Sequence, residues 1–168
     1  MEQKLSPDRI DHLRQDYEQG FVRYCGFKAD KIEYGNFRSL VNIQDHHRQQ
    51  DGFIHAGVMA TMADHTAGYS AFTVVDEAFQ ILSIEFKINF FKPAFGAGLE
   101  CRSTVVRKGR QILVAESEVY DLRKDLKKDL CADLEEDRNE KKKVLVAKAT
   151  VTLMAVLNKT LAQKKTNR

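Results

Sequence analysis

A strict alternation of apolar and polar residues marks the clearest strand of the chain, at residues 82–91. Its even positions are apolar and its odd positions up to Asn89 are polar, as in Leu82, Ser83, Ile84 and Glu85. A period of two is typical of a β-strand with one buried face. We therefore expect the even-numbered side chains, through Phe90, to share one face of a sheet.

Several other segments have strand character. Residues 99–106 and 111–120 flank a basic turn that contains Gly109, which predicts a hairpin. Residues 143–156 alternate again and place five apolar side chains on one face: Leu145, Ala147, Ala149, Val151 and Leu153. Upstream, residues 21–27 and 37–43 are shorter β-like pieces, interrupted by Gly26 and Gly35. Together these segments predict an antiparallel sheet.

Two segments follow a helical pattern instead. The first covers residues 7–19, where Ser6 can cap the free N–H groups, Pro7 suits the first turn and Gly20 ends the helix. The second, residues 57–75, is apolar on nearly every side and rich in small residues, which is typical of a buried helix that another backbone approaches closely. The pattern predicts an α+β fold, a single domain in which a curved antiparallel sheet wraps one long central helix.

A highly charged segment separates the last two predicted strands. Residues 121–143 contain eight acidic and eight basic residues among twenty-three, yet leucines recur every four positions, at Leu122, Leu126, Leu130 and Leu134. We interpret this insertion as a solvated helical excursion or hairpin extension, the alternative being a partner-binding helix. The predicted organisation is an N-terminal helix at 1–20, a domain at 21–157 and a basic tail at 158–168.

Composition excludes several classes of protein. A chain of 168 residues with 43% apolar residues and only two prolines can bury a core, unlike collagen-like or disordered chains. Its three cysteines have no CxxC spacing, which favours a reducing cytosol. There is no signal-peptide pattern and no apolar run long enough for a membrane span, so we expect a cytoplasmic protein. A net charge of +3 does not indicate nucleic-acid binding.

The start of the buried helix carries the candidate chemistry. The N–H groups of Ala56 and Gly57 lie in its first turn, at the positive end of the helix dipole, and can stabilise a developing oxyanion. Asp64 follows two turns later among Ala and Met residues, where burying a carboxylate is costly. Asp64 is therefore either a catalytic group or a structural hydrogen-bonding group, and His55 either shapes a pocket or belongs to a turn.

A metal site is not indicated. Four histidines lie between residues 46 and 65, but no HxH or HxxxH pair is present. The adjacent His46 and His47 would point apart if they lay on a strand. We expect neither a metal nor an organic cofactor.

These residues resemble a known family, the hotdog-fold acyl-CoA thioesterases of the PaaI type (4-hydroxybenzoyl-CoA thioesterase-like). Its members commonly show Asn-x-x-Gly-x-x-His-Gly-Gly and an aspartate nine residues after the histidine. Gly52, His55, Gly57 and Asp64 match this pattern, and the similarity covers about residues 37–156 without the charged insertion. Two positions depart from it: glutamine replaces asparagine at 49, and alanine replaces the first glycine at 56, which keeps the N–H but excludes positive φ.

The resemblance implies a hydrolase that cleaves acyl-CoA to a free acid and coenzyme A, which enters only as part of the substrate. Ala56 would donate its N–H to the thioester oxygen, and Asp64 would act as general base or nucleophile. His55 and Gln49 would shape the pocket, and Ser83 would help to place the water. The family's site is shared across a homodimer or a dimer of dimers, with the aspartate of one chain facing the helix start of the other.

The sequence does not decide which residues contact the rest of the substrate. Arg107, Lys108 and Arg110 at the hairpin tip either bind phosphates of coenzyme A or are simply solvated. Four apolar side chains either line an acyl channel or belong to the core: Met59, Phe72, Phe86 and Phe90. Acyl-chain preference is not readable from the sequence.

Other functions remain as alternatives. The replacements at 49 and 56 also suit a non-catalytic acyl-CoA-binding or regulatory module. A hotdog dehydratase is disfavoured because no Asp-x-Asn-Pro-x-His pattern is present. A DNA-binding regulator is disfavoured because residues 7–19 supply only one helix outside the core.

Overall fold

The computed structural model describes residues 4–123 and 142–158. Most of the charged segment at 121–143 therefore lies outside the described residues, together with Leu126, Leu130 and Leu134 of its leucine repeat. The basic tail lies outside them as well, from residue 159 onward.

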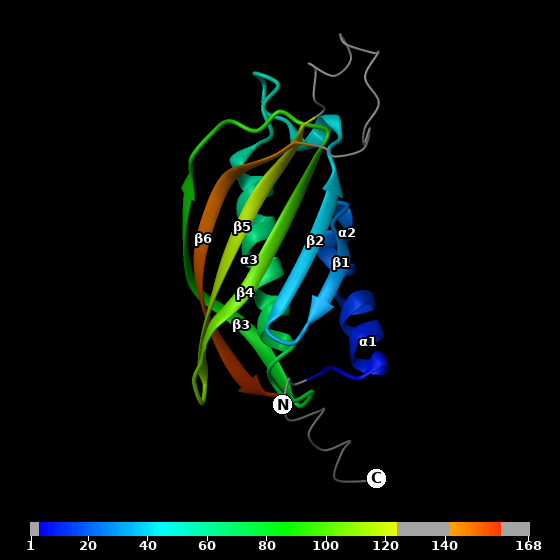
Figure 1. Ribbon diagram of the computed structural model, residues 1–168, viewed down its shortest axis with the longest axis vertical. Coiled ribbons are helices and arrows are strands. Elements are labelled where there is room, and N and C mark those ends of the chain that lie inside the picture. The colour runs from blue at the N-terminus through cyan, green and yellow to red at the C-terminus, as the bar shows by residue number, and fades with distance from the viewer. Residues whose placement is uncertain (1–3, 124–141, 159–168) are drawn as a thin grey trace, which may run out of the picture.

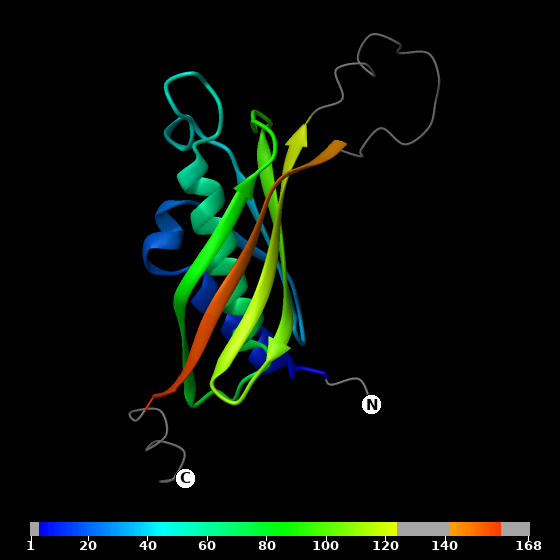
Figure 2. The same ribbon diagram turned by 90° about the vertical axis from the view of Figure 1, so that its left-hand side faces the viewer.

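A long helix, α3 (Ala56–Phe72), lies in the hollow of a curved six-stranded antiparallel sheet (Figures 1 and 2). The strand order is β1-β2-β4-β5-β6-β3. The strands are β1 (Lys28–Glu33), β2 (Asn36–Asn42), β3 (Phe79–Phe90), β4 (Gly98–Lys108), β5 (Ile112–Arg123) and β6 (Lys142–Leu157). The predicted α+β architecture is confirmed.

The core lies between α3 and the inner face of the sheet. Met62, Ala63 and Ala67 of α3 are completely buried, as are Val151 and Leu153 on the facing side of β6. Small side chains on both surfaces allow the sheet to approach the helix closely, as its composition predicted.

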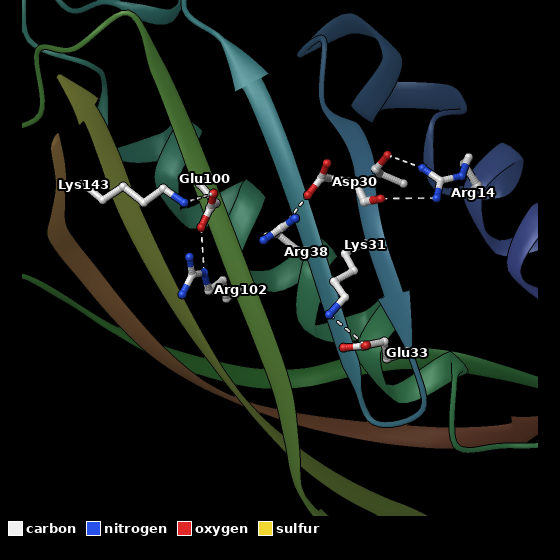
Figure 3. A network of polar contacts seen from close by, with 9 residues as sticks. Arg14, Asp30, Lys31, Glu33, Arg38, Glu100, Arg102 and Lys143 are labelled. Atoms are coloured by element: carbon white, nitrogen blue, oxygen red, sulfur yellow. Dashed lines mark hydrogen bonds and ion pairs between the residues drawn. The ribbon is translucent and has the colours of Figure 1, made fainter. Parts of the chain in front are cut away.

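The first helix, α1 (Pro7–Tyr17), begins where the sequence indicated. The Ser6 side chain accepts a hydrogen bond from Arg9 N at 3.2 Å, and Pro7 opens the first turn. The helix ends at Tyr17, two residues before the predicted end. Arg14 donates to the carbonyl oxygens of Ala29 and Asp30, which fastens α1 to the edge strand β1 (Figure 3).

The segment predicted as a strand at residues 21–27 is a short helix, α2 (Gly20–Tyr24). The segment is too short for a helical and an extended period to be distinguished. Gly20 enters α2 with a φ of 60°, and of its apolar side chains only Val22 is buried. The following strand β1 escaped prediction because a register shift at Asp30 breaks its alternation.

Strand β3 does not keep a single alternation. Its pairing with β6 shifts between Ser83 and Glu85, so Ile84 is an extra, bulged residue. Ser83 and Phe86 lie opposite buried residues of β6 and face α3, whereas Leu82 lies opposite Met154 on the outer face. The prediction that Leu82 shares a face with Phe86 and Phe90 is wrong because the bulge exchanges the faces.

The outer face of the sheet carries charged groups (Figure 3). Glu100 of β4 is only 4% exposed and accepts hydrogen bonds from Arg102 Nε at 2.6 Å and Lys143 Nζ at 2.9 Å. Burial alone would raise the pKa of Glu100, but the bonds from Lys143 and Arg102 outweigh it and hold this pKa below the ordinary value.

Candidate active site

A small hairpin leads the chain into α3. Arg48 and Ile54 form a β-bridge, and Gln49 accepts a hydrogen bond from Gly52 N through its carbonyl oxygen at 2.9 Å. Gly52 has a φ of 80°, which glycine adopts without strain. The backbone of Gln49 therefore shapes the approach to the helix start.

His55 caps α3. Its backbone is extended, with φ −61° and ψ 136°, and its Nδ1 accepts a hydrogen bond from Gly57 N at 2.9 Å. A Cβ atom at position 57 would lie 2.9 Å from that same Nδ1. Gly57 thus leaves room for the capping ring, and its N–H is engaged by His55 rather than free for an oxyanion.

Ala56 supplies the free donor of this turn. It is the first residue of α3 and exposed, and helical backbone has negative φ, so alanine replaces glycine here without strain. Among residues 4–123 and 142–158, no acceptor contacts Ala56 N. An oxyanion can therefore be held by Ala56 N–H near the positive end of the helix dipole.

Asp64 lies on the flank of α3 that faces strand β3. Ser83 Oγ donates a hydrogen bond to Asp64 Oδ1 at 2.7 Å. The side chain is half-buried rather than deeply buried as the apolar helix suggested, since β3 is the last strand of the sheet and leaves this flank partly open. The bond orients the carboxylate, and among the described residues no hydrogen bond or ion pair reaches Oδ2.

One chain does not bring these groups together. Asp64 follows Ala56 by eight residues on the same helix, a separation of about 12 Å at 1.5 Å per residue. A carboxylate that far along the axis cannot act on a carbonyl held at the helix start.

The basic hairpin between β4 and β5 lies at the opposite end of the molecule from the start of α3 (Figure 1). Lys108 Nζ donates to the hydroxyl of Tyr34 at 3.3 Å. Lys108 and Arg110 also border a cavity of about 210 Å³, with apolar walls from residues such as Val74 and Phe79. Within one chain, Arg107, Lys108 and Arg110 are thus remote from His55 and Ala56.

The four candidate acyl-channel residues divide into two groups. Met59 belongs to the core, and the half-buried Phe72 packs against Tyr69. Phe86 and Phe90 are 43% and 46% exposed on the inner side of β3. Of the four candidates, only Phe86 and Phe90 offer a large exposed apolar surface on the side of the sheet that carries α3.

His46 and His47 do not point apart on a strand. They lie in a 3₁₀ turn, η1 (Asp45–His47), and their ring centroids are 4.1 Å apart. His47 is buried, and burial lowers its pKa, while its carbonyl oxygen accepts a hydrogen bond from His55 N at 2.8 Å. In the described part of the chain, no three His, Cys, Asp or Glu side chains converge as metal ligands do.

Sequence reasoning missed one carboxylate near the helix start. Asp121, at the end of β5, is completely buried and accepts hydrogen bonds from the loop that follows β3. Its place in the sequence is a usable signal, because it continues the inward-facing positions Leu113, Ala115, Ser117 and Val119. Its charged neighbours in the sequence place it in the predicted insertion at 121–143 instead.

Comparisons with known proteins agree with the fold. A family model described as the thioesterase superfamily matches residues 51–127. The crystal structure of a thioesterase family protein from Silicibacter pomeroyi is 29% identical, covers 89% of this chain and 98% of its own, and superimposes with a TM-score of 0.76. The resemblance to hotdog thioesterases inferred from the sequence is confirmed.

More distant relatives extend the comparison. The PaaI protein of the E. coli phenylacetic acid degradation operon is 16% identical, with a TM-score of 0.69 over 90% of this chain and 96% of its own, and shows the shared fold. SSO2140 of Saccharolobus solfataricus, whose name proposes an esterase, is 28% identical over 67% of this chain and 79% of its own. The esterase relative and the thioesterase-superfamily match support hydrolysis of an ester or thioester in general terms.

The described helices carry no transmembrane signal. None of them combines the length and the apolar composition that crossing a bilayer requires.

Proposed function

From the thioesterase-superfamily match, the hotdog fold and the geometry around Asp64, we propose that this protein hydrolyses acyl-CoA thioesters to a free acid and coenzyme A. The observation that carries the proposal is the hydrogen bond from Ser83 to Asp64. It fixes one carboxylate oxygen and leaves the other open on a half-buried flank of the central helix. A purely structural aspartate would have both oxygens engaged or solvated away from such a flank.

The chemistry requires two protein groups. Asp64 accepts a proton from water as the water oxygen attacks the thioester carbon, and Ala56 N–H donates to the carbonyl oxygen as it becomes negative. The C–S bond then breaks, and coenzyme A leaves as the thiolate and takes up a proton. In the second version of this mechanism, Asp64 attacks the carbon itself and water hydrolyses the resulting anhydride. Neither version uses a metal or an organic cofactor.

The complete site contains two chains. Asp64 and Ala56 of one chain are about 12 Å apart, so the helix start must come from a second copy. Strand β3 is the natural contact, because it is an edge strand with exposed apolar residues that include Ile84, Phe86 and Phe90.

The position of the two-fold axis can be worked out from these elements. To bring the partner's helix start level with Asp64, the axis must cross about 6 Å, half of the separation, from Asp64 toward the start of α3. Ser83 is level with Asp64, and 6 Å is about two paired positions along β3, which leads to Phe86 because Ile84 is bulged. The axis then passes near Glu85 and Phe86, close to the middle of strand β3 (Phe79–Phe90), which is where an antiparallel strand pair would be centred.

This arrangement also places the substrate. A two-fold axis near Glu85 brings the β4–β5 hairpin of one chain to the same end as the helix start of the other. Arg107, Lys108 and Arg110 then meet the phosphates of coenzyme A bound there. The acyl group lies against Phe86 and Phe90, whose exposed faces suit an aliphatic or aromatic chain.

A thiol-release assay tests the activity. The protein is offered short, long and aromatic acyl-CoAs, and Asp64→Asn is assayed beside it. We expect hydrolysis by the wild type and a loss of about a hundredfold or more in the variant, with the fold intact. Binding of acyl-CoA in a calorimeter without thiol release would replace the hydrolase by a non-catalytic binding module.

Mixing two inactive variants tests the shared site. Asp64→Asn lacks the carboxylate, and Ala56→Pro lacks the helix-start N–H. If each site uses one group from each chain, random reassociation restores one intact site in half of the dimers, which gives about one quarter of the wild-type activity. A mixture that stays as inactive as its components, although the subunits exchange, would place both groups in one chain.

A further inference from the structure

The buried carboxylate of Asp121 is unused by the mechanism above. It is completely buried at the end of β5, where its Oδ1 accepts from Gly96 N at 2.8 Å and its Oδ2 from Phe95 N at 3.2 Å. Arg123 Nε donates to Oδ2 at 2.7 Å. Hydrogen bonds to an ionised acceptor are the stronger kind, and all three converge on this side chain.

The loop at residues 93–97 is built to fit this carboxylate. A Cβ atom on Gly96 would lie 2.3 Å from Asp121 Oδ1 and 2.5 Å from the Leu122 carbonyl oxygen, so no other residue fits there without moving the backbone. Arg123 binds the same loop through two contacts. Its guanidinium lies 4.0 Å from the Phe95 ring centroid and donates a hydrogen bond to Pro93 O at 3.1 Å.

The carbonyl oxygens of this loop accept hydrogen bonds from the residues that lead into α3. Ala94 O accepts from Ile54 N at 2.8 Å, and Gly96 O accepts from Arg48 Nη2 at 3.1 Å. Arg48 Nη1 also donates to Gly52 O at 2.9 Å, which ties the turn of the hairpin to the same loop. Ile54 is separated from Ala56 by a single residue, so these bonds fix the backbone just before the free N–H.

We propose that Asp121, supported by Arg123, is a positioning residue for the oxyanion donor: it clamps residues 93–97, and that loop holds Ile54, Arg48 and thereby the start of α3. The effect on catalysis rests on the proposed function, whereas the hydrogen bonds that tie Asp121 to residues 93–97 do not depend on it. Asp121 touches no substrate. Its effect on the reaction is to hold Ala56 N–H at a fixed place and direction, since a displacement of about 1 Å there is enough to slow a reaction strongly.

The chain offers a matched control for a merely structural role. Glu100 is a second buried carboxylate, on the neighbouring strand β4, and it is also bound by two cationic side chains. It lies on the outer face of the sheet (Figure 3), and none of its described contacts reaches residues 93–97. Removing the charge of Glu100 disturbs a buried carboxylate of the same sheet without touching the clamp.

The experiment compares the full-length wild type with Asp121→Asn, Arg123→Gln and Glu100→Gln. Amide hydrogen exchange is followed by NMR for Ile54 and His55, whose N–H groups bond to Ala94 O and His47 O. Asp121→Asn and Arg123→Gln are the two clamp variants. In both we expect the Ile54 amide to exchange about tenfold faster or more, relative to amides in the centre of β6. Arg123 is 24% exposed, so Arg123→Gln keeps the test available if Asp121→Asn fails to fold.

Thiol release is measured on the same proteins. We expect kcat to fall by about tenfold to a hundredfold in the clamp variants with KM within about twofold of the wild type, and no comparable change in Glu100→Gln. A further variant, Arg123→Lys, keeps the positive charge and should recover part of the activity that Arg123→Gln loses. Equal acceleration of Ile54 exchange in Glu100→Gln, or a kcat unchanged in a clamp variant whose Ile54 exchanges faster, would overturn the proposal. If the wild type releases no thiol from any acyl-CoA, the proposed function fails, and the exchange data still decide whether the clamp exists.

Discussion

Replacing Ala56 with proline isolates the one atom group on which the oxyanion argument depends. Proline is tolerated at the first position of a helix, where the N–H has no intrahelical acceptor. The residue before a proline must be extended, and His55 already has φ −61° and ψ 136°. The substitution therefore removes the donor of Ala56 and leaves the helix start otherwise compatible with its present geometry.

Ala56→Pro is expected to change stability and activity by very different amounts. Because Ala56 N has no acceptor among the described residues, its loss breaks no hydrogen bond there, and proline reduces the freedom of the unfolded chain. We expect the free energy of unfolding to stay the same or to rise by about 0.4–1 kcal/mol. Removing one oxyanion donor costs about 2.7–4 kcal/mol in the transition state, a loss of about 10²–10³ in kcat. A protein that is as stable as the wild type but nearly inactive is the expected result.

Circular dichroism and thermal melting check the fold of Ala56→Pro, and thiol release from acyl-CoA gives its kcat. Ala56→Gly is the control, because it keeps the N–H and restores the more common His-Gly-Gly sequence, and it should retain activity close to the wild type. A folded Ala56→Pro protein that hydrolyses acyl-CoA within tenfold of the wild-type rate would refute the role of this N–H group.

Three further predictions follow from individual contacts. Gly57→Ala places a Cβ atom 2.9 Å from His55 Nδ1, so the capping bond is lost at a cost of about 1 kcal/mol, and the melting temperature should fall by a few degrees; an unchanged melt contradicts this. Ser83→Ala removes the bond that orients Asp64 and should lower kcat about tenfold with little change in KM, whereas a change in KM alone would assign Ser83 to substrate binding. The lowered pKa of Glu100 means that its stabilisation is present above pH 4.5 and is lost as the pH falls through the folded-state pKa. In urea titrations, Glu100→Gln should be less stable than the wild type at pH 7, and the gap should close in acid; a gap independent of pH would exclude this linkage.

Much of the fold was already specified locally. The buried helix and the strands after it were predicted within a few residues of their observed bounds, because long segments with one clear period leave little choice of structure. The same local reasoning identified the unsatisfied N–H groups at the helix start and the isolated Asp64. Errors arose where the period was short or interrupted, as at residues 21–27 and at the Asp30 register shift of β1.

The site itself required the tertiary structure. A one-residue bulge at Ile84 turns Ser83 toward Asp64, and no alternation pattern can show which residue of a strand is the extra one. Likewise, the sequence placed Asp121 in a charged insertion, although its side chain is the buried anchor of a loop from another part of the chain.

The sequence by itself determined most of the elements and the polar groups that the central helix carries, since hydrophobic period, capping residues and turn glycines act between neighbours along the chain. Only the tertiary structure decided which side chains are in contact: Ser83 with Asp64, and Asp121 with residues 93–97. It also decided that the basic β4–β5 hairpin lies at the end of the molecule opposite the start of α3. These contacts and positions depend on strand order, on register and on the length of the helix, which are set by packing between segments far apart in the chain.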